Sequence, residues 1–237
     1  MSTAATLRGV SFLQQASEDG LDRLVAQSVQ RRFERGMFLF RAGEPADRIY
    51  VLRRGRVAAV VGSRQGNRLT FHLAAEGECA GYSSMLDPLG HQASAQALTP
   101  VEAVVIPTTA CLALVSAEPA VALDFARELS GIIRVLNESM ADLVFLDLTR
   151  RLARALLDAP HRHGAISFPV SQTELAARLG SARQSLNQAF GRLAQRGFIR
   201  LDSPRTVQIL DRDALRAYVD DLPTPLRVDG SAQDPPV

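Results

Sequence analysis

The segment from Ser171 to Gly197 constrains the fold more than any other part of the chain, because it predicts two short helices joined by a glycine turn. Ser171 and Glu174 have the S-x-x-E spacing of a capping box at the start of the first helix. Gly180 is expected to end that helix, since glycine adopts a left-handed conformation without strain. Ser181 is then expected to cap the second helix.

The second helix, from about Ala182 to Arg196, is predicted to be apolar on one side and polar on the other. Its apolar side holds Leu186, Ala189, Phe190 and Leu193, and its polar side holds Arg183, Gln184, Ser185, Asn187, Gln188 and Arg192. Side chains of these polar types hydrogen-bond base edges and phosphates in a major groove. Two strand-like runs follow, over residues 198–201 and 206–210. The pattern favours a DNA-binding winged helix-turn-helix over two surface helices of an ordinary helical core.

The positive charge of the chain is concentrated around this motif. Residues 150–210 hold ten arginines and three acidic residues, a net charge of +7, whereas residues 1–149 hold 14 arginines and 16 acidic residues. The chain has no lysine, so all of this charge is carried by guanidinium groups. A basic module inside a chain whose net charge is only +2 is typical of a surface that binds phosphates.

Length and composition exclude several classes of protein. The 237 residues fit one large domain or two smaller ones. The apolar runs are too short to cross a bilayer and the N-terminus has no signal-peptide pattern, so we expect a cytoplasmic protein. Cys79 and Cys111 are too few for an iron–sulfur cluster and lack the spacing of a zinc site. No nucleophile–base pair or phosphate-binding loop indicates an enzyme, so we predict no catalytic residue and no metal site.

The pattern changes twice before the helix-turn-helix. Residues 9 to about 29 have apolar side chains at helical spacing, which predicts helix. From Phe33 to about Pro107, short apolar runs alternate with glycine turns, which predicts an antiparallel sandwich or roll. The expected strands are 38–40, 49–52, 57–61, 69–73 and 103–106. The chain is therefore expected to be an α+β protein.

A long helix is predicted from about Pro119 to Phe145. Apolar residues recur on it in heptads, at Ala126, Leu129, Ile133, Leu136, Met140 and Leu143. Such an a/d pattern, with leucine at each d position, favours a parallel two-stranded coiled coil between two copies of the chain. A second apolar face is formed by Leu123, Phe125, Ile132, Val135 and Val144. We expect this face to cover the roll, although a single helix packed only on its own roll remains the alternative.

The order of glycine-spaced roll, long helix and winged helix-turn-helix resembles the CRP/FNR family of bacterial transcription regulators. The resemblance rests on three stretches, 33–57 in the opening strands, 145–152 at the hinge after the long helix, and 173–186 in the helix-turn-helix. It implies an N-terminal antiparallel β-roll, cyclic-nucleotide-binding-like, over 9–118 and a dimerisation helix over 119–145. It also implies a Crp-type winged helix-turn-helix domain over 146–213, and the proline-rich segment 223–237 is expected to be a disordered tail.

The sequence departs from the family at the cyclic AMP site. In members that bind cyclic AMP, a cassette carries a glutamate for a ribose hydroxyl, an arginine for the cyclic phosphate and then serine or threonine. Here the resemblance places Tyr82 at the glutamate, Gln92 at the arginine and Ala93 at the hydroxyl residue. Without the arginine, the site lacks the fixed positive charge that pairs with the cyclic phosphate in the family. The resemblance thus implies the fold and DNA binding while arguing against cyclic AMP.

The same region still predicts a candidate effector pocket. Its residues are Gly81, Tyr82, Ser83, Ser84, Gln92 and Ala93, with Leu136 and Asn137 at the positions of the long helix that meet adenine in the family. Haem needs an axial ligand, for which His72, His91 and Cys79 are candidates by type alone. Cyclic di-GMP has no arginine cluster to indicate it. A neutral or polar ligand and the absence of any effector both remain open.

The resemblance also assigns roles in DNA binding. Arg183 is expected to read guanine, while Gln184 and Gln188 are the variable readers of the base edges. Register on the phosphates is expected from Ser171, Gln172, Ser181 and Ser185, with Arg192 or Arg200. Dimer symmetry predicts an inverted-repeat operator with half-sites one helical turn apart. The loop 159–164 corresponds to a family contact with RNA polymerase, or is a plain solvated loop.

Overall fold

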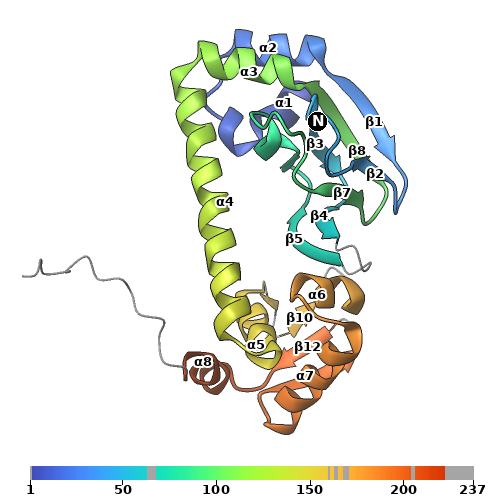
Figure 1. The fold of residues 1–237 in the computed structure, drawn as a ribbon, viewed down its shortest axis with the longest axis vertical. Helices are drawn as coiled ribbons and strands as arrows, with labels where there is room; N and C mark the ends of the chain where they lie inside the picture. Colours follow the sequence, from blue (N-terminus) through green and yellow to red (C-terminus); the bar gives the residue numbers. More distant parts are fainter. Residues whose placement is uncertain are drawn as a thin grey trace, which may run out of the picture. The chain divides into compact units, whose positions relative to one another are not determined.

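The computed structural model of this chain describes residues 2–62, 68–159, 161–162, 165–167, 171–203 and 206–221. It divides into two compact units, Met1–Asn137 and Glu138–Val237 (Figure 1). Antiparallel strands dominate the first unit and helices the second, which confirms the predicted α+β class. The tail expected to be disordered lies outside the described residues.

The N-terminal segment of the first unit is helical only in part, so the prediction of helix over residues 9–29 was too broad. The structure has α1 (Thr3–Arg8), the short 3-10 helix η1 (Ser11–Leu13) and α2 (Glu18–Gln27). The break has a physical cause, because the Ser17 hydroxyl caps α2 by accepting a hydrogen bond from the Gly20 amide at 3.0 Å. Residues 29–33 leave the helix altogether and form a strand.

Two four-stranded antiparallel sheets form the roll, in the orders β1-β8-β3-β6 and β2-β7-β4-β5. Their bounds are β1 (Val29–Phe33), β2 (Phe38–Phe40), β3 (Arg48–Arg54), β4 (Val57–Gly62), β5 (Arg68–Ala74), β6 (Cys79–Ala80), β7 (Ser94–Ala97) and β8 (Val101–Pro107). A second 3-10 helix, η2 (Tyr82–Ser84), follows β6. The expected strands are present, and β1, β6 and β7 are additional.

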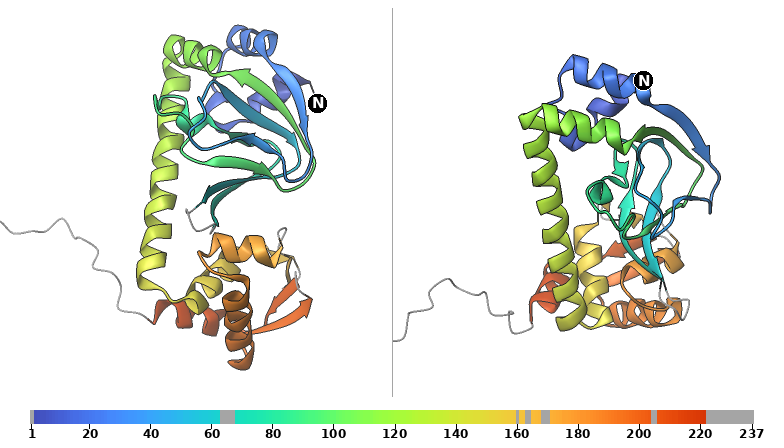
Figure 2. Two further views of the ribbon diagram at one scale, coloured as in Figure 1. Left: turned by 45° about the vertical axis from the view of Figure 1, so that its right-hand side comes forward. Right: turned by 45° about the horizontal axis from the view of Figure 1, so that its top comes forward.

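Strand β3 is buried on both faces, which explains its continuous apolar run. Ile49 and Val51 belong to a core shared with the helices, whereas Tyr50 and Leu52 belong to the core between the two sheets. This alternation follows from the two-residue period of a strand. The helix-facing core is completed by α3 (Thr108–Ala117), which lies beside α2 at one end of the strands (Figure 2).

Helix α4 (Pro119–Phe145) runs as one continuous helix over the predicted range (Figure 1). Val121 and Phe125, in its N-terminal part, are buried in the helix-facing core. Among the described residues no single helix is long and apolar enough to cross a membrane, although α3 and α4 would pass such a test as a pair bent by 116°.

The described part of the second unit combines helices with a small sheet. After the C-terminal end of α4, its helices are α5 (Leu148–Asp158), α6 (Gln172–Arg178), α7 (Arg183–Gln195) and α8 (Arg212–Asp220). Its sheet has the order β11-β12-β10-β9, formed by β9 (His161–Arg162), β10 (Ala165–Ser167), β11 (Ile199–Ser203) and β12 (Thr206–Ile209). Fully buried side chains from five of these elements form the core, namely Leu152, Leu156, Ile166, Leu186, Val207 and Leu215.

Two glycines in the roll have the same backbone conformation but different surroundings. Gly55 has φ +94°, and a Cβ atom there would lie 2.3 Å from the carbonyl oxygen of Pro100. Gly36 has φ +88°, and a Cβ atom there would meet nothing within 4 Å. Both positions favour glycine for conformational reasons, but only Gly55 also needs it for space.

We predict that Gly55→Ala destabilises the protein more than Gly36→Ala. The left-handed conformation costs a side chain about 1–2 kcal/mol at either position, and the clash at Gly55 adds about 1–3 kcal/mol for overpacking. Urea unfolding of both variants measures the difference directly. Equal unfolding midpoints would contradict the role assigned to the Pro100 contact.

Candidate functional site

The capping box predicted at the start of α6 is present. The Glu174 amide donates to the Ser171 hydroxyl at 3.3 Å, and the Ser171 amide donates to the Glu174 carboxylate at 2.6 Å. The two residues thereby satisfy each other's backbone donors at the helix end. This fixes the beginning of the helix-turn-helix by local interactions alone.

The turn between α6 and α7 differs in one detail from expectation. Gly180 has φ +63° and ends α6 as predicted. Ser181, however, does not cap α7, because its amide and its hydroxyl both donate to the carbonyl of Ala176, at 2.9 and 3.4 Å. Ser181 therefore completes the C-terminal cap of α6. The N-cap of α7 is Ala182, whose side chain makes no capping hydrogen bond.

Helix α7 has the two faces predicted for it. Leu186, Ala189, Phe190 and Leu193 are buried, whereas Arg183, Gln184, Asn187, Gln188 and Arg192 are exposed. Three other predicted DNA contacts, Ser171, Gln172 and Ser185, are half-buried. The exposed face presents amide and guanidinium groups, which can make two-pronged hydrogen bonds to the edges of adenine and guanine.

Two of the arginines expected on phosphates already have partners within the unit. Arg192 donates through Nε to the Thr149 hydroxyl at 2.9 Å, which ties α7 to α5. Arg200 donates through Nε to the carboxylate of Asp202 at 2.9 Å within strand β11. Each guanidinium has further N–H groups that remain suited to phosphate oxygens.

Part of the loop expected over 159–164 is a strand. His161 and Arg162 form β9 and pair with β10. The remaining positions 160, 163 and 164 lie outside the described residues.

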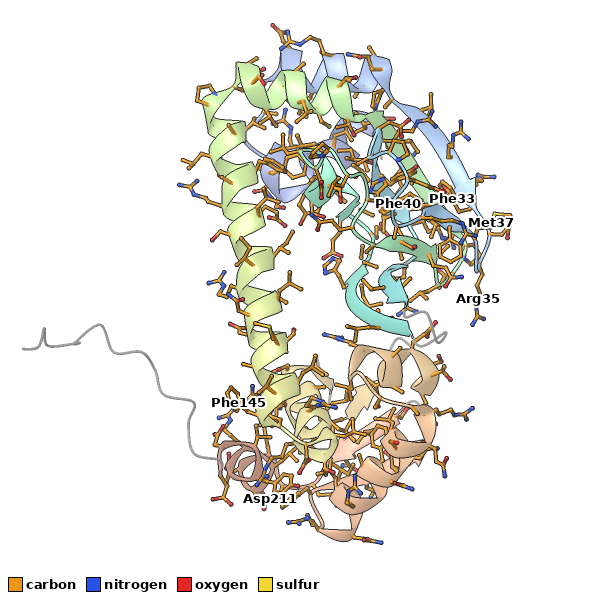
Figure 3. The ribbon with its side chains drawn as sticks, in the orientation of Figure 1. Phe33, Arg35, Met37, Phe40, Phe145 and Asp211 are labelled. Atoms are coloured by element: carbon orange, nitrogen blue, oxygen red, sulfur yellow. The ribbon has the colours of Figure 1, made fainter. Side chains whose placement is uncertain are left out.

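The first unit contains a cavity of about 500 Å³ between the roll and its part of α4. All the residues predicted for an effector pocket line it except Asn137. Phe40 of β2, labelled in Figure 3, also lines the cavity and stacks on His91 with ring centroids 3.6 Å apart. The volume lies within the range of pockets that bind small molecules.

Tyr82 joins the cavity wall to α4. Its hydroxyl donates to Glu128 Oε1 at 3.1 Å, and the Ser11 hydroxyl donates to Glu128 Oε2 at 2.8 Å. Burial raises the pKa of Tyr82, and the neighbouring Glu128 carboxylate raises it further. The Tyr82 hydroxyl therefore stays protonated and acts as a hydrogen-bond donor. Both carboxylate oxygens of Glu128 accept a hydrogen bond.

Gln92 is held by the roll itself. Its Nε2 donates to the Asp87 carboxylate at 3.0 Å, and its amide lies 3.4 Å from the Ser84 hydroxyl. The bond from Gln92, together with one from the Leu89 amide, lowers the pKa of Asp87. Gln92 thus brings no positive charge to the cavity, and its side-chain donor is engaged by an acid.

The cavity wall contributed by α4 was foreseen only in part, through Leu136 and the apolar face that was expected to cover the roll. Besides Leu136, α4 contributes Arg127, Glu128, Gly131, Ile132, Arg134 and Val135. Their spacing, near i, i+4 and i+7, places them on one side of the helix. The heptad pattern identified only the apolar residues, so the two arginines beside them were missed.

The residues considered for haem differ in their surroundings. His72 and Cys79 line the cavity, and burial raises the pKa of the Cys79 thiol well above its usual value. His91 is buried, its Nδ1 has no hydrogen-bond partner among the described residues, and burial lowers its pKa. In the described part of the chain, no group of three or more His, Cys, Asp or Glu side chains could hold a metal ion.

Comparison with known proteins identifies two domains along this chain. A cyclic nucleotide-binding domain model matches residues 30–118, and a Crp-like helix-turn-helix domain model matches residues 150–218. A CRP-like cAMP-activated global transcriptional regulator of Mycobacterium tuberculosis is 30% identical over 190 residues, which cover 77% of this chain and 84% of that protein. The chain belongs to the CRP/FNR family of transcription regulators.

Other CRP/FNR proteins extend the match. A cyclic AMP receptor protein of Thermus thermophilus is 27% identical over 203 residues, which cover 86% of this chain and 94% of that protein. The solved structure of a CRP/FNR-family transcriptional regulator from Thermus thermophilus has 26% identity and a TM-score of 0.65, and it covers 82% of this chain and 100% of that chain. This CRP/FNR protein is therefore a DNA-binding transcription regulator with a cyclic-nucleotide-binding-type domain.

Proposed function

We propose that this protein is a homodimeric, sequence-specific transcription regulator whose DNA binding is not controlled by cyclic AMP. The observation that carries the proposal is α7, whose buried apolar face fixes it in its unit while its exposed face presents Arg183, Gln184 and Gln188. In helix-turn-helix proteins the second helix lies in the major groove and its N-terminal residues contact the bases. Arg183 is the first residue of α7.

Dimerisation is supported by the exposed apolar surface of α4. Ile133 and Met140 are 59% and 61% exposed, and Leu136 and Leu143 are each 44% exposed. Leu129, also assigned to the heptad seam, is packed in part against the core of its own unit. At the C-terminal end of the helix, Phe145 is 56% exposed (Figure 3). A second copy of α4 would remove such a stripe from water.

Ile133→Glu is expected to yield monomers with weak affinity for DNA, because a charge would be buried in the centre of the seam. Glu138→Lys, a charge change on the same helix but outside the seam, is expected to leave the dimer intact. Sedimentation equilibrium at micromolar concentration distinguishes the two variants. A monomeric wild-type protein would rule out the seam.

Arg183→Ala is expected to cost about 1–3 kcal/mol of specific binding and to relax the preference at one base pair. Arg200→Ala, the matched variant on the wing, is expected to weaken binding to all sequences alike and to reduce its salt dependence. Fluorescence anisotropy with an inverted-repeat operator and with random DNA measures both effects. Equal losses from Arg183→Ala on the two DNAs would assign Arg183 to the phosphates.

Independence from cyclic AMP follows from the groups at the cassette. The Gln92 side chain donates a hydrogen bond to Asp87, and the Tyr82 hydroxyl donates one to Glu128. Ala93 has no hydroxyl. None of the three reproduces the charge-assisted hydrogen bonds that the family makes to the phosphate and the ribose. The positive charges near the cavity are on α4 instead.

We therefore expect calorimetry to detect no micromolar binding of cyclic AMP, and no change in DNA affinity when it is added. Each lost charge-assisted bond is worth roughly 1.5–3 kcal/mol, so the combined loss amounts to orders of magnitude in affinity. The triple variant Tyr82→Glu, Gln92→Arg and Ala93→Ser is expected to regain part of the binding. A micromolar dissociation constant for the wild type would overturn this part of the proposal.

A contact with RNA polymerase through residues 159–164 is proposed from the resemblance to the family. Ligand binding as the main role is the second candidate function, and the cavity favours it. A salt series separates the two, since DNA binding through arginines weakens steeply as salt is added.

A further inference from the structure

We propose that the cavity beside α4 binds an organic carboxylate with an apolar body, and that Arg134 holds the carboxylate. The inference rests on the proposal that cyclic AMP is not the effector.

The floor of the cavity suits an apolar body. The roll contributes small or apolar side chains to it, from the strands and from Ala93 just before β7, namely Val57, Ala59, Ala74, Ala80, Ala93 and Ala95. Helix α4 adds Ile132, Val135 and Leu136 from the opposite side. Apolar lining with a few placed polar groups is the usual composition of a small-molecule site.

Open space lies beside Gly131. It lies in the interior of α4 and lines the cavity, and a Cβ atom there would meet nothing within 4 Å. Glycine destabilises a helix interior relative to alanine, and no neighbouring atom requires it here. Close packing is therefore not the reason for a glycine at this position. The cavity has room for a ligand against the helix backbone there.

The charges that line the cavity favour an anion. Arg127 and Arg134 contribute two positive charges and Glu128 one negative charge, whereas Tyr82 stays protonated and Gln92 is neutral. Arg127 is already paired with Asp124 at 2.8 Å. Arg134 has no ion-pair partner among the described residues.

The existing ion pair of Arg127 decides which arginine holds the anion. A bound anion at Arg127 would compete with the Asp124 carboxylate, which already contacts that guanidinium at 2.8 Å. Arg134 lies six residues beyond Glu128 on α4, which is about 9 Å along the helix axis. A guanidinium binds a carboxylate through two parallel hydrogen bonds, which a single arginine can supply.

The test uses the full-length protein and two probes of nearly equal shape, 1-naphthaleneacetate and its neutral amide, 1-naphthaleneacetamide. Calorimetry is expected to show saturable binding of the acid at least about 10-fold tighter than that of the amide, as one charge-assisted pair provides. Arg134→Gln is expected to abolish this preference. Arg216→Gln, an exposed arginine on α8, is expected to retain it.

Gly131→Leu provides a second test, since its side chain would fill the cavity and weaken both probes together. If that variant is poorly folded by circular dichroism, the Arg134→Gln comparison still decides. Equal binding of acid and amide, a preference that survives Arg134→Gln, or no saturable binding of either probe would overturn the inference. DNA binding measured on the same wild-type sample reports separately on the regulator proposal, which would fail if no DNA were bound.

Discussion

The apolar surface of α4 is the constraint on which much of this structure depends. Its N-terminal part is buried through Val121 and Phe125, but Ile133 and Met140 are more than half exposed within the chain. Each exposed Å² of apolar surface costs about 25 cal/mol relative to burial. Covering the exposed part of this surface would therefore be favourable, and the cavity and the proposed dimer seam both lie along it.

Glu128 connects this helix to the rest of the first unit. It accepts hydrogen bonds from Tyr82 in η2 and from Ser11 in η1, so a single carboxylate joins three segments distant in sequence. In the cyclic AMP site that the family implies, a glutamate of the roll meets a hydroxyl of the ligand. Here the hydroxyl belongs to Tyr82 and the carboxylate to α4, so the protein makes within itself a contact of the kind that a nucleotide would otherwise supply.

The parts that could be predicted from the sequence are those determined by local interactions or by a repeated spacing of apolar residues along a helix. The Ser171–Glu174 capping box, the faces of α7 and the range of α4 follow from spacing alone. Strand β1 was missed because its side chains are mostly exposed, and the four-residue β7 because serine, alanine and glutamine have little preference for strands.

Ser181 and the two arginines that line the cavity could not be assigned from the sequence, because their roles depend on tertiary contacts. A serine between two helices can hydrogen-bond either the start of the second helix or the end of the first. The structure shows that Ser181 bonds the Ala176 carbonyl at the end of α6, which the spacing alone does not decide. Arg127 and Arg134 line the cavity because of how α4 is rotated against the roll. In the proposed arrangement this rotation also sets the seam, since Ile133, Arg134 and Leu136 lie within one turn of the same helix. A ligand held by Arg134 would therefore contact the helix within one turn of the proposed seam.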